Sequence, residues 1–217
     1  MKKTSISITS ELIEAGKEIV SQGLVRGSGG NLSGRQADQL WITRSGANLN
    51  TLTESDFVLV GSPPDSTERP PRPSSELAMH LAAYEAQPEI SVVLHVHPPK
   101  AISLGLIGCS LPALTPDFYL HLGPAVPLIP YVTPTTNELA AAVRKQLIAH
   151  PAVMLQNHGV LVVGVSTRQA LLRLFLLEEH AAIYLDAQAT GQPLRLLNEQ
   201  DMEKLDRVTG GRYKNKK

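Results

Sequence analysis

The sequence predicts an α/β domain, and three observations lead to that fold class. Short β-branched and apolar runs, typical of buried strands, are interspersed with longer segments whose apolar residues recur at helical spacing. Hydrophobic residues make up 42% of the 217 residues, which is enough to bury a substantial core. The chain shows neither an internal repeat nor a clear domain boundary. We therefore expect residues 1–217 to fold as a single domain.

Charge and cysteine content exclude several classes of protein. The chain has 20 basic and 20 acidic residues, so no net field favours nucleic acid or an anionic membrane, and we expect neither partner. No run approaches the ~20 apolar residues of a membrane span, and the first residues lack the apolar stretch of a signal peptide. Cys109 is the single cysteine, which excludes an internal disulfide and a thiolate-rich metal site. These features predict a cytoplasmic protein in which a metal would be bound by histidine and carboxylate.

The first elements are a helix, a glycine-rich segment and a strand. Residues 9–23 carry leucine, isoleucine and valine at helical spacing, with Thr9 or Ser10 as the N-cap. Residues 26–34 contain too many glycines to continue a helix. They predict either an anion-binding arrangement of backbone N–H groups or a plain turn into a strand over 39–43.

A proline-rich loop over 62–73 precedes the next helix, which begins at Ser74 or Ser75 and ends near residue 86. Glu76 lies in its first turn, where the helix dipole favours negative charge, so capping alone accounts for a carboxylate at this position. His80 follows one turn later. Its apolar neighbours favour a buried supporting residue over a metal ligand.

The most informative stretch is 91–99, where two histidines lie near the end of a short strand. Residues 92–96 are apolar and mostly β-branched, and two prolines end the run. Since side chains alternate along a strand, His95 and His97 share one face, with Cβ atoms ~6.6 Å apart. Two imidazoles can lean from that separation onto one ion with bonds of ~2.1 Å. The geometry suits a metal, although so short a motif also occurs by chance.

The same periodicity assigns the remaining elements. Further strands are expected over 56–61, 152–155 and 160–165. Further helices are expected over 99–106, 136–149 and 167–187, and in a polar stretch near the C-terminus. The proline-rich residues 109–131 predict a loop and a strand. Asn157-His158-Gly159 joins two strands with turn chemistry, and Gly159 is free to take a positive φ. His158 is therefore either a turn residue or a third imidazole at the end of a sheet.

Four side chains fall at the ends of elements or at the rim of a short strand: Glu76, His95, His97 and His158. Metal sites on α/β scaffolds are built at such edges. Three histidines and one carboxylate match the ligands preferred by Zn²⁺ or another divalent transition metal. The sequence therefore predicts one such ion per subunit.

Several motifs, in this order and at these spacings, resemble the class II aldolase/adducin family over most of the chain. They are Gly29-Gly30-Asn31-Leu32-Ser33, Thr43-Arg44-Ser45-Gly46, Pro73-Ser74-Ser75-Glu76 with His80, His95-Val96-His97, Tyr131 with Thr136-x-Glu138-Leu139, and Asn157-His158-Gly159. The resemblance implies a three-layer α/β/α sandwich around a mostly antiparallel central sheet. It also implies a homotetramer with active sites at the subunit interfaces.

The resemblance also implies roles for individual residues. It makes His95, His97 and His158 the metal ligands, with Glu76 as a catalytic base that also approaches the metal. The positions that would hold the phosphate of a sugar or sugar-acid phosphate are Gly30, Asn31, Ser45, Gly46, Ser74 and Ser75. Physical chemistry agrees, because backbone N–H groups and hydroxyls can bind a phosphate dianion without lysine.

The implied activity is a zinc-dependent lyase that cleaves a carbon–carbon bond in a ketose or keto-acid phosphate and releases dihydroxyacetone phosphate through a metal-stabilised enediolate. The same site would serve a 3-oxo-tetronate 4-phosphate decarboxylase, or a sugar-phosphate epimerase or dehydratase. A non-catalytic adducin-like module has no reason to keep these residues together.

One loop departs from the aldolase pattern. Aldolases of the family carry a tyrosine proton donor where this chain reads Leu114-Thr115-Pro116-Asp117, a turn closer to the decarboxylases. The decarboxylases usually carry a tyrosine where Asp117 stands, so Tyr119 is the expected substitute as proton donor; on a strand it would keep the face of Asp117 but lie ~6.6 Å further along. His121 nearby is expected to be structural.

Overall fold

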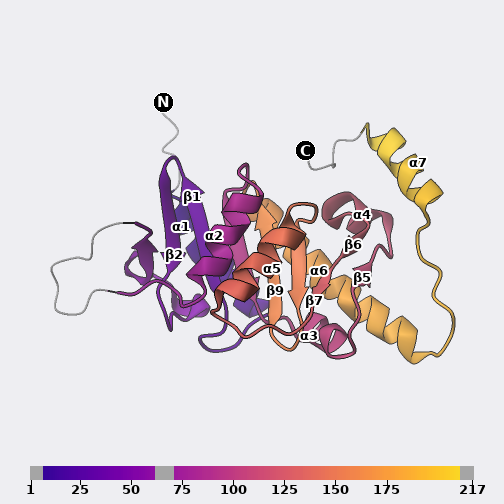
Figure 1. Cartoon of the computed structure of the whole chain (residues 1–217), viewed down its shortest axis with the longest axis horizontal. Helices are drawn as coiled ribbons and strands as arrows, with labels where there is room; N and C mark the ends of the chain where they lie inside the picture. Colours follow the sequence, from indigo (N-terminus) through magenta and orange to yellow (C-terminus); the bar gives the residue numbers. More distant parts are fainter. Residues whose placement is uncertain (1–6, 62–70, 211–217) are drawn as a thin grey trace.

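The computed structural model describes residues 7–61 and 71–210, which form a central sheet flanked by helices (Figure 1). Its helices are α1 (Ile8–Ser21), α2 (Leu77–Ala86), α3 (Pro99–Leu106), α4 (Pro116–Leu122), α5 (Asn137–Leu147), α6 (Thr167–Ala189) and α7 (Glu199–Thr209). Its strands are β1 (Asn31–Gln36), β2 (Gln39–Thr43), β3 (Phe57–Leu59), β4 (Val92–Val96), β5 (Leu111–Pro112), β6 (Ala125–Val126), β7 (Leu128–Ile129), β8 (Ala152–Leu155) and β9 (Gly159–Gly164). Two 3₁₀ turns, at Leu49–Thr51 and Glu54–Asp56, precede β3. Most of the predicted proline-rich loop lies outside the described residues.

The described residues form a seven-stranded sheet in the order β3-β2-β1-β4-β9-β8-β7. Neighbouring strands run antiparallel, except β7 and β8, which are parallel. In the middle of the sheet β4 pairs with β9, from Val92 opposite Gly164 to Val96 opposite Val160. A separate two-stranded ribbon joins β5 to β6. The expectation of a mostly antiparallel central sheet is confirmed.

Alternate residues of the central strands pack against helices on opposite faces of the sheet, which gives three layers. Along β4, the side chains of Val92, Leu94 and Val96 join a core with α1, α3 and α6. Val93 points the other way and joins a second core with α2 and α5. Strands β8 and β9 divide their side chains in the same manner. The predicted α/β/α sandwich is therefore confirmed, and His95 faces the layer of α2 and α5.

Polar residues begin several helices by accepting backbone N–H groups. Thr136 caps α5 and Ser166 caps α6, each through its hydroxyl. Helix α1 begins before the predicted Thr9 or Ser10, because the hydroxyl of Ser7 accepts the backbone N–H of Ser10. None of the helices in the described ranges is long and apolar enough to cross a membrane.

The structure corrects the prediction for the glycine-rich segment, whose second half forms β1 instead of a turn. Gly34 weakens the strand pattern in the sequence, because glycine is disfavoured in strand interiors. The structure explains its presence: a Cβ at Gly34 would lie 2.3 Å from Ile8 Cγ1. The close approach of α1 to β1 therefore requires glycine, a tertiary constraint that strand propensity does not reveal.

The prediction of a loop and strand over 109–131 is wrong in its middle, where α4 forms. The hydroxyl of Thr115 accepts the backbone N–H of Phe118 at 3.2 Å. Pro116 occupies the first turn, where its missing N–H costs no helical hydrogen bond. Phe118 and Leu122 are fully buried and anchor this short helix in the core shared with α6.

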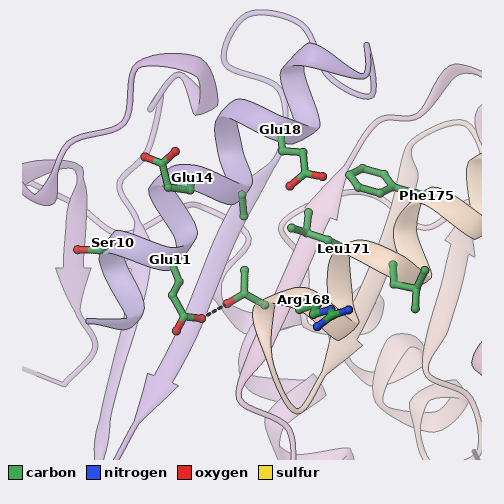
Figure 2. Close-up of a pocket in the computed structure, with 10 residues that line it drawn as sticks. Ser10, Glu11, Glu14, Glu18, Arg168, Leu171 and Phe175 are labelled. Carbon is green, nitrogen blue, oxygen red and sulfur yellow. Dashed lines mark hydrogen bonds between the residues drawn. The ribbon is translucent and has the colours of Figure 1, made fainter. Parts of the chain in front are cut away.

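A groove of about 570 Å³ lies between α1 and α6, apart from the histidines singled out above (Figure 2). Leu171 and Phe175 line its α6 side, and Glu14 and Glu18 line its α1 side. At one end the hydroxyl of Thr167 donates a hydrogen bond to Glu11 at 2.7 Å, which ties the two helices together.

Two matched valine substitutions test the buried central strand. Val162 of β9 is fully buried, whereas Val208 of α7 is 84% exposed. We expect Val162→Ala to lower the free energy of unfolding by about 1.5–3 kcal/mol, because two buried methyl groups are lost at ~0.8 kcal/mol each and a cavity is left. Val208→Ala should change it by less than about 0.5 kcal/mol. Urea unfolding at equal subunit concentration measures both, and equal losses would contradict the arrangement.

Candidate metal centre

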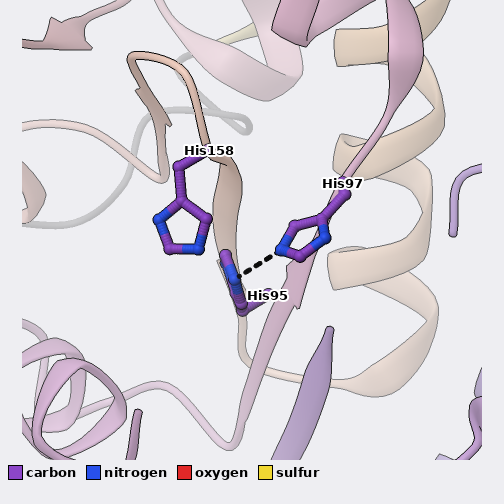
Figure 3. Close-up of side chains that lie close together, drawn as sticks. All are labelled: His95, His97 and His158. Carbon is purple, nitrogen blue, oxygen red and sulfur yellow. Dashed lines mark hydrogen bonds between the residues drawn. The ribbon is translucent and has the colours of Figure 1, made fainter. Parts of the chain in front are cut away.

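Three histidines gather where β4 ends beside the turn between β8 and β9 (Figure 3). His95 lies within β4, His97 follows the end of that strand, and His158 lies in the turn before β9. Because β4 pairs with β9, with His95 opposite Leu161, the turn is carried next to the end of β4. One ring nitrogen from each histidine lies within 4.8 Å of the others. The Nε2 atoms of His95 and His97 are 3.2 Å apart.

Two glycines let the backbone come close to His97. A Cβ at Gly159 would lie 2.7 Å from His97 Cδ2, and a Cβ at Gly29 would lie 3.1 Å from His97 Nδ1. In the turn, Asn157 takes the left-handed conformation, with a φ of 59°, and Gly159 does not, which corrects the prediction. Asparagine tolerates that conformation. Gly159 is therefore required by close packing, because a Cβ there would lie 2.4 Å from the carbonyl oxygen of Val96 as well as against the His97 ring.

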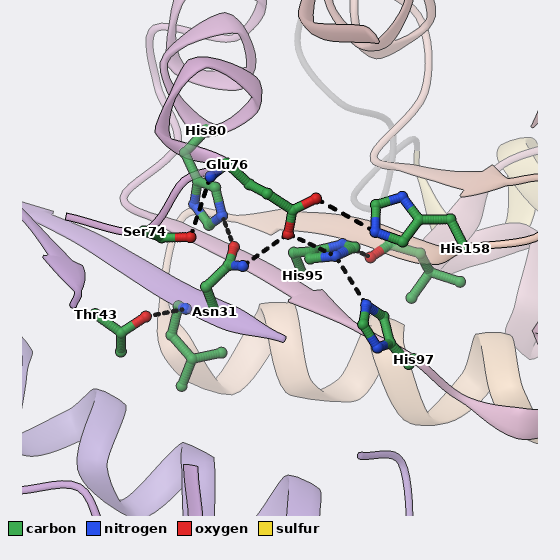
Figure 4. Close-up of polar contacts among 10 residues, drawn as sticks. Asn31, Thr43, Ser74, Glu76, His80, His95, His97 and His158 are labelled. Carbon is green, nitrogen blue, oxygen red and sulfur yellow. Dashed lines mark hydrogen bonds and ion pairs between the residues drawn. The ribbon is translucent and has the colours of Figure 1, made fainter. Parts of the chain in front are cut away.

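Glu76 brings a carboxylate to the same place from the start of α2 (Figure 4). The helix begins after Glu76, not at Ser74 or Ser75 as predicted, and no side chain caps it. Ser74 instead accepts the backbone N–H of Glu76 at 3.2 Å. The Glu76 carboxylate is thus free to face the histidines, with Oε2 3.1 Å from His95 Nε2 and Oε1 3.3 Å from His158 Nε2.

This cluster holds more acceptors than donors, which fits a bound cation. His95 Nδ1 lies 2.9 Å from the carbonyl oxygen of Val160, which can only accept, so Nδ1 carries a proton. In the neutral ring that a metal requires, the lone pair is then on His95 Nε2, which faces both His97 Nε2 and Glu76 Oε2. Glu76 Oε1 is buried without a hydrogen-bond partner in the described part of the chain. A backbone carbonyl that orients the imidazole of a metal ligand is a common feature of metal sites.

The electrostatics leaves the carboxylate ionised and one imidazole neutral. Burial alone would raise the pKa of Glu76, but the close imidazoles of His158 and His95 and the hydrogen bond from Asn31 outweigh it and hold that pKa well below its usual range. Burial, together with the charges of His95 and His158, lowers the pKa of His97 to about 4. At neutral pH the His97 ring therefore needs to lose no proton before it binds a metal.

The spacing of the donor atoms also fits zinc. With Zn–N and Zn–O bonds of about 2.0–2.1 Å, the ligand atoms of a tetrahedral site lie about 3.3 Å apart. The contact between His95 and His97 measures 3.2 Å, those of Glu76 with His95 and His158 measure 3.1 and 3.3 Å through its two oxygens, and the three imidazole nitrogens lie within 4.8 Å of one another. The residues present thus fit a zinc-sized divalent ion.

The predicted phosphate contacts lie mainly on two segments that run side by side. A β-bridge pairs Arg44 with Pro73, which brings the Ser45-Gly46 turn beside the Ser74-Ser75 pair. Gly46 has a φ of 73°, a conformation that favours glycine. All four residues come before Glu76 in the sequence. Of these, Ser75 is exposed and could contact a ligand.

The other two predicted phosphate contacts lie closer to the histidines. Gly30 packs against β4, since a Cβ there would lie 2.6 Å from the carbonyl oxygen of His95. Asn31 is buried, and its Nδ2 donates to Glu76 Oε2 at 2.8 Å while its Oδ1 lies 2.5 Å from His80 Nε2. Both ends of the Asn31 amide are therefore engaged within the protein, and its predicted contact with the phosphate stays a prediction.

Tyr119 does not join this cluster within the chain. It lies on α4, where each residue turns by about 100°, so it does not keep the face of Asp117 as it would on the predicted strand. The Tyr119 hydroxyl donates to Asp206 of α7 at 3.0 Å. His121 lies 3.6 Å from Asp117 on the same helix. The role of Tyr119 as a proton donor stays a prediction.

The sequence predicted His80 as a buried supporting residue but not the partners that connect it to Glu76. His80 is fully buried and contacts Asn31 and Ser33, as a supporting residue would. Ser33 lies in the strand that was not predicted, so its partnership with His80 had no signal in the spacing of the residues. The Asn31 motif was visible, but not the direction of its side chain.

Known proteins with similar sequences and structures extend these observations. A family profile described as Class II Aldolase and Adducin N-terminal domain matches residues 10–185. The chain is 34% identical over 199 residues to a 5-deoxy-D-ribulose 1-phosphate aldolase of Bacillus thuringiensis serovar kurstaki, covering 90% of this chain and 92% of that one. It is 30% identical over 195 residues to the L-fuculose phosphate aldolase of Escherichia coli K12, covering 90% of each. A solved L-fuculose 1-phosphate aldolase matches with a TM-score of 0.84 at 31% identity, over 95% of this chain and 98% of that one.

Removing one histidine of the cluster is expected to weaken zinc binding. His97→Ala and His158→Ala each delete one ligand nitrogen, so the dissociation constant should rise about 100-fold or more, beyond the 10- to 100-fold effect of supporting residues. His150→Ala removes a histidine outside the cluster, so its dissociation constant for zinc should stay within about twofold of that of the native protein. Competition with a chromophoric chelator measures the three constants. Native affinity in His97→Ala would contradict the assignment.

Proposed function

Because the chain belongs to the class II aldolase and adducin family, we propose that it is a zinc-dependent lyase that cleaves a ketose 1-phosphate and releases dihydroxyacetone phosphate. The observation that carries this proposal is the cluster of three imidazoles at the end of the central strands, two of which, His95 and His158, contact the Glu76 carboxylate. The relatives named as sugar-phosphate aldolases support the carbon–carbon lyase class and the phosphorylated substrate.

The mechanism assigns ligand and proton-transfer roles to this chain's own residues. His95, His97 and His158 would hold the ion, with Glu76 beside it. Bound there, a divalent ion supplies a Lewis acid for the negative charge that develops on the ketone oxygen of the substrate. Glu76, held ionised, accepts the proton of the substrate hydroxyl next to the breaking bond.

The electrons and the proton then balance within the active site. As the carbon–carbon bond breaks, its electron pair stays with the ketone fragment, and the carbon that carried the hydroxyl becomes an aldehyde. Glu76 returns its proton to the carbon of the ketone fragment, which leaves as dihydroxyacetone phosphate. A keto-acid phosphate would lose carbon dioxide in place of the aldehyde; since its carboxylate gives Glu76 no proton, the carbon of the ketone fragment would take its proton from water.

Substitution of Glu76 tests this role. Glu76→Gln keeps the shape of the side chain but cannot carry the proton, so we expect kcat to fall by about 10²- to 10⁴-fold. Glu14→Gln, an exposed carboxylate on α1, is the control and should keep native turnover. Dihydroxyacetone phosphate is measured with a coupled reductase on L-fuculose 1-phosphate, 5-deoxyribulose 1-phosphate and a 3-oxo-acid phosphate. Full turnover by Glu76→Gln would rule out the proton transfer, and release of carbon dioxide from the oxo acid alone would replace the aldolase with a decarboxylase.

The phosphate end of the substrate is proposed to lie at Gly30, Asn31, Ser45, Gly46, Ser74 and Ser75. Because Ser75 is exposed and its hydroxyl would donate to the phosphate, a carboxylate there would repel the dianion. We expect Ser75→Asp to raise KM about tenfold or more, while Ser75→Ala raises it only a few-fold, as for one lost hydrogen bond. Ser103→Asp on exposed α3 controls for added charge. Initial rates over a range of substrate concentrations give KM, and an unchanged KM in Ser75→Asp would place the phosphate elsewhere.

The resemblance of the motifs also supports proposals on assembly and location. We propose a cytoplasmic homotetramer with one ion per subunit. Sedimentation equilibrium together with elemental analysis of the purified protein measures both the mass of the assembly and the metal content of each subunit.

A further inference from the structure

A chain of buried hydrogen bonds runs from Tyr84 to the Glu76 carboxylate, part of it drawn in Figure 4. The Tyr84 hydroxyl lies 3.0 Å from Ser33 Oγ, which lies 2.7 Å from His80 Nδ1. On the other side of the ring, His80 Nε2 lies 2.5 Å from Asn31 Oδ1, and Asn31 Nδ2 lies 2.8 Å from Glu76 Oε2. Every member is buried. The chain joins β1 to α2 across one layer of the fold.

The donor and acceptor groups allow only one direction of donation along this row of hydrogen bonds. An ionised Glu76 only accepts, so the group of Asn31 that faces it is the donating Nδ2, and Oδ1 faces His80. His80 Nε2 must then donate, which makes Nδ1 of the neutral ring an acceptor. Ser33 consequently donates to His80, and its oxygen accepts from Tyr84, whose hydroxyl lies closer to it, at 3.0 Å, than to its other acceptor, the carbonyl oxygen of Ser91 at 3.5 Å. All four hydrogen bonds therefore point toward the carboxylate.

The charge states of the members agree with that direction. Burial, helped by the charge of His95, lowers the pKa of His80 to about 3, so the ring is neutral at pH 7. Burial raises the pKa of Tyr84, which keeps its hydroxyl proton available to donate. Neutral members with one permitted order of donors form a network that specifies one side-chain arrangement.

We propose that His80 is a positioning residue of the lyase site, whose Nε2–H fixes the Asn31 amide in the orientation that donates to Glu76. The inference rests on the proposed function in one respect, that Glu76 is the catalytic carboxylate. Without a donor at His80, the amide can turn over and bring Oδ1 against the carboxylate, where two acceptors repel. Glu76 would then lose its amide donor and could turn away from the histidines.

The tautomer of His80 tests the inference without any assay of activity. Nitrogen-15 NMR of histidine-labelled protein at pH 7 distinguishes a ring protonated at Nε2 from one protonated at Nδ1, and His80→Gln identifies the resonance. We expect the Nε2–H tautomer alone, in the metal-free and the zinc-loaded protein. A ring protonated at Nδ1, or at both nitrogens, would overturn the proposed direction.

Two conservative substitutions separate positioning from packing. The amide nitrogen of Gln at position 80 can take the place of Nε2–H, whereas Asn reaches only the position of Nδ1. We expect His80→Gln to keep kcat within about threefold and His80→Asn to lower it about 10- to 100-fold, with KM little changed at saturating zinc. Equal losses of kcat in the two variants, in step with equal losses of Tm, would show that His80 only fills space.

Two controls act at the far end of the chain. Ser33→Ala and Tyr84→Phe remove hydroxyls that do not touch Asn31, so they should lower Tm while kcat stays within about threefold, because His80 keeps its donor to Asn31. A loss of kcat in these variants as large as in His80→Asn would overturn the role of the Nε2–H group. If the native protein turns over none of the ketose phosphates, the proposed function fails, and the NMR result still decides the inference about His80.

Discussion

The antiparallel pairing of β4 with β9 is the contact on which the candidate site depends. It sets His95 opposite Leu161 and so brings the turn that holds His158 beside the end of β4. Both strands are buried between two helical layers, which hold the backbones that carry the imidazoles in place. Glu76 arrives from α2, which belongs to one of those layers. The cores that stabilise the sheet therefore also orient the site, which is how rigid elements hold functional groups in place.

In the site, the acceptor atoms of Glu76 and the histidines lie close together, and neighbouring backbone and side-chain groups form hydrogen bonds with their other sides. The carbonyl of Val160 fixes the proton of His95, and the Asn31 amide delivers one donor to Glu76. When the imidazoles are neutral, their remaining lone pairs face one another and the carboxylate, an arrangement that is costly when buried and that a cation relieves. The same placement of polar atoms therefore fixes the supporting hydrogen bonds and gives the site its affinity for an ion.

Much of the fold was predictable because local patterns agreed with tertiary contacts. The strand over 152–155 and the helix over 99–106 have the predicted bounds. The metal candidates were predictable because ligand residue types fell at element ends. Strand β1 was not, since Gly34 is set by the approach of α1. The partnership of Ser33 with His80 joins residues 47 positions apart and has no periodic signal. Contacts of that kind are decided by packing, which composition and spacing do not encode.

The most direct test of the account is the turnover of L-fuculose 1-phosphate and 5-deoxyribulose 1-phosphate before and after exhaustive dialysis against a chelator. We predict that the dialysed protein no longer releases dihydroxyacetone phosphate and that release returns when about one equivalent of Zn²⁺ per subunit is added. We also predict that the dialysed protein stays folded, since the sheet and its two cores do not involve the ion. Undiminished release by folded, metal-free protein would contradict the central claim that these acceptors serve a catalytic metal.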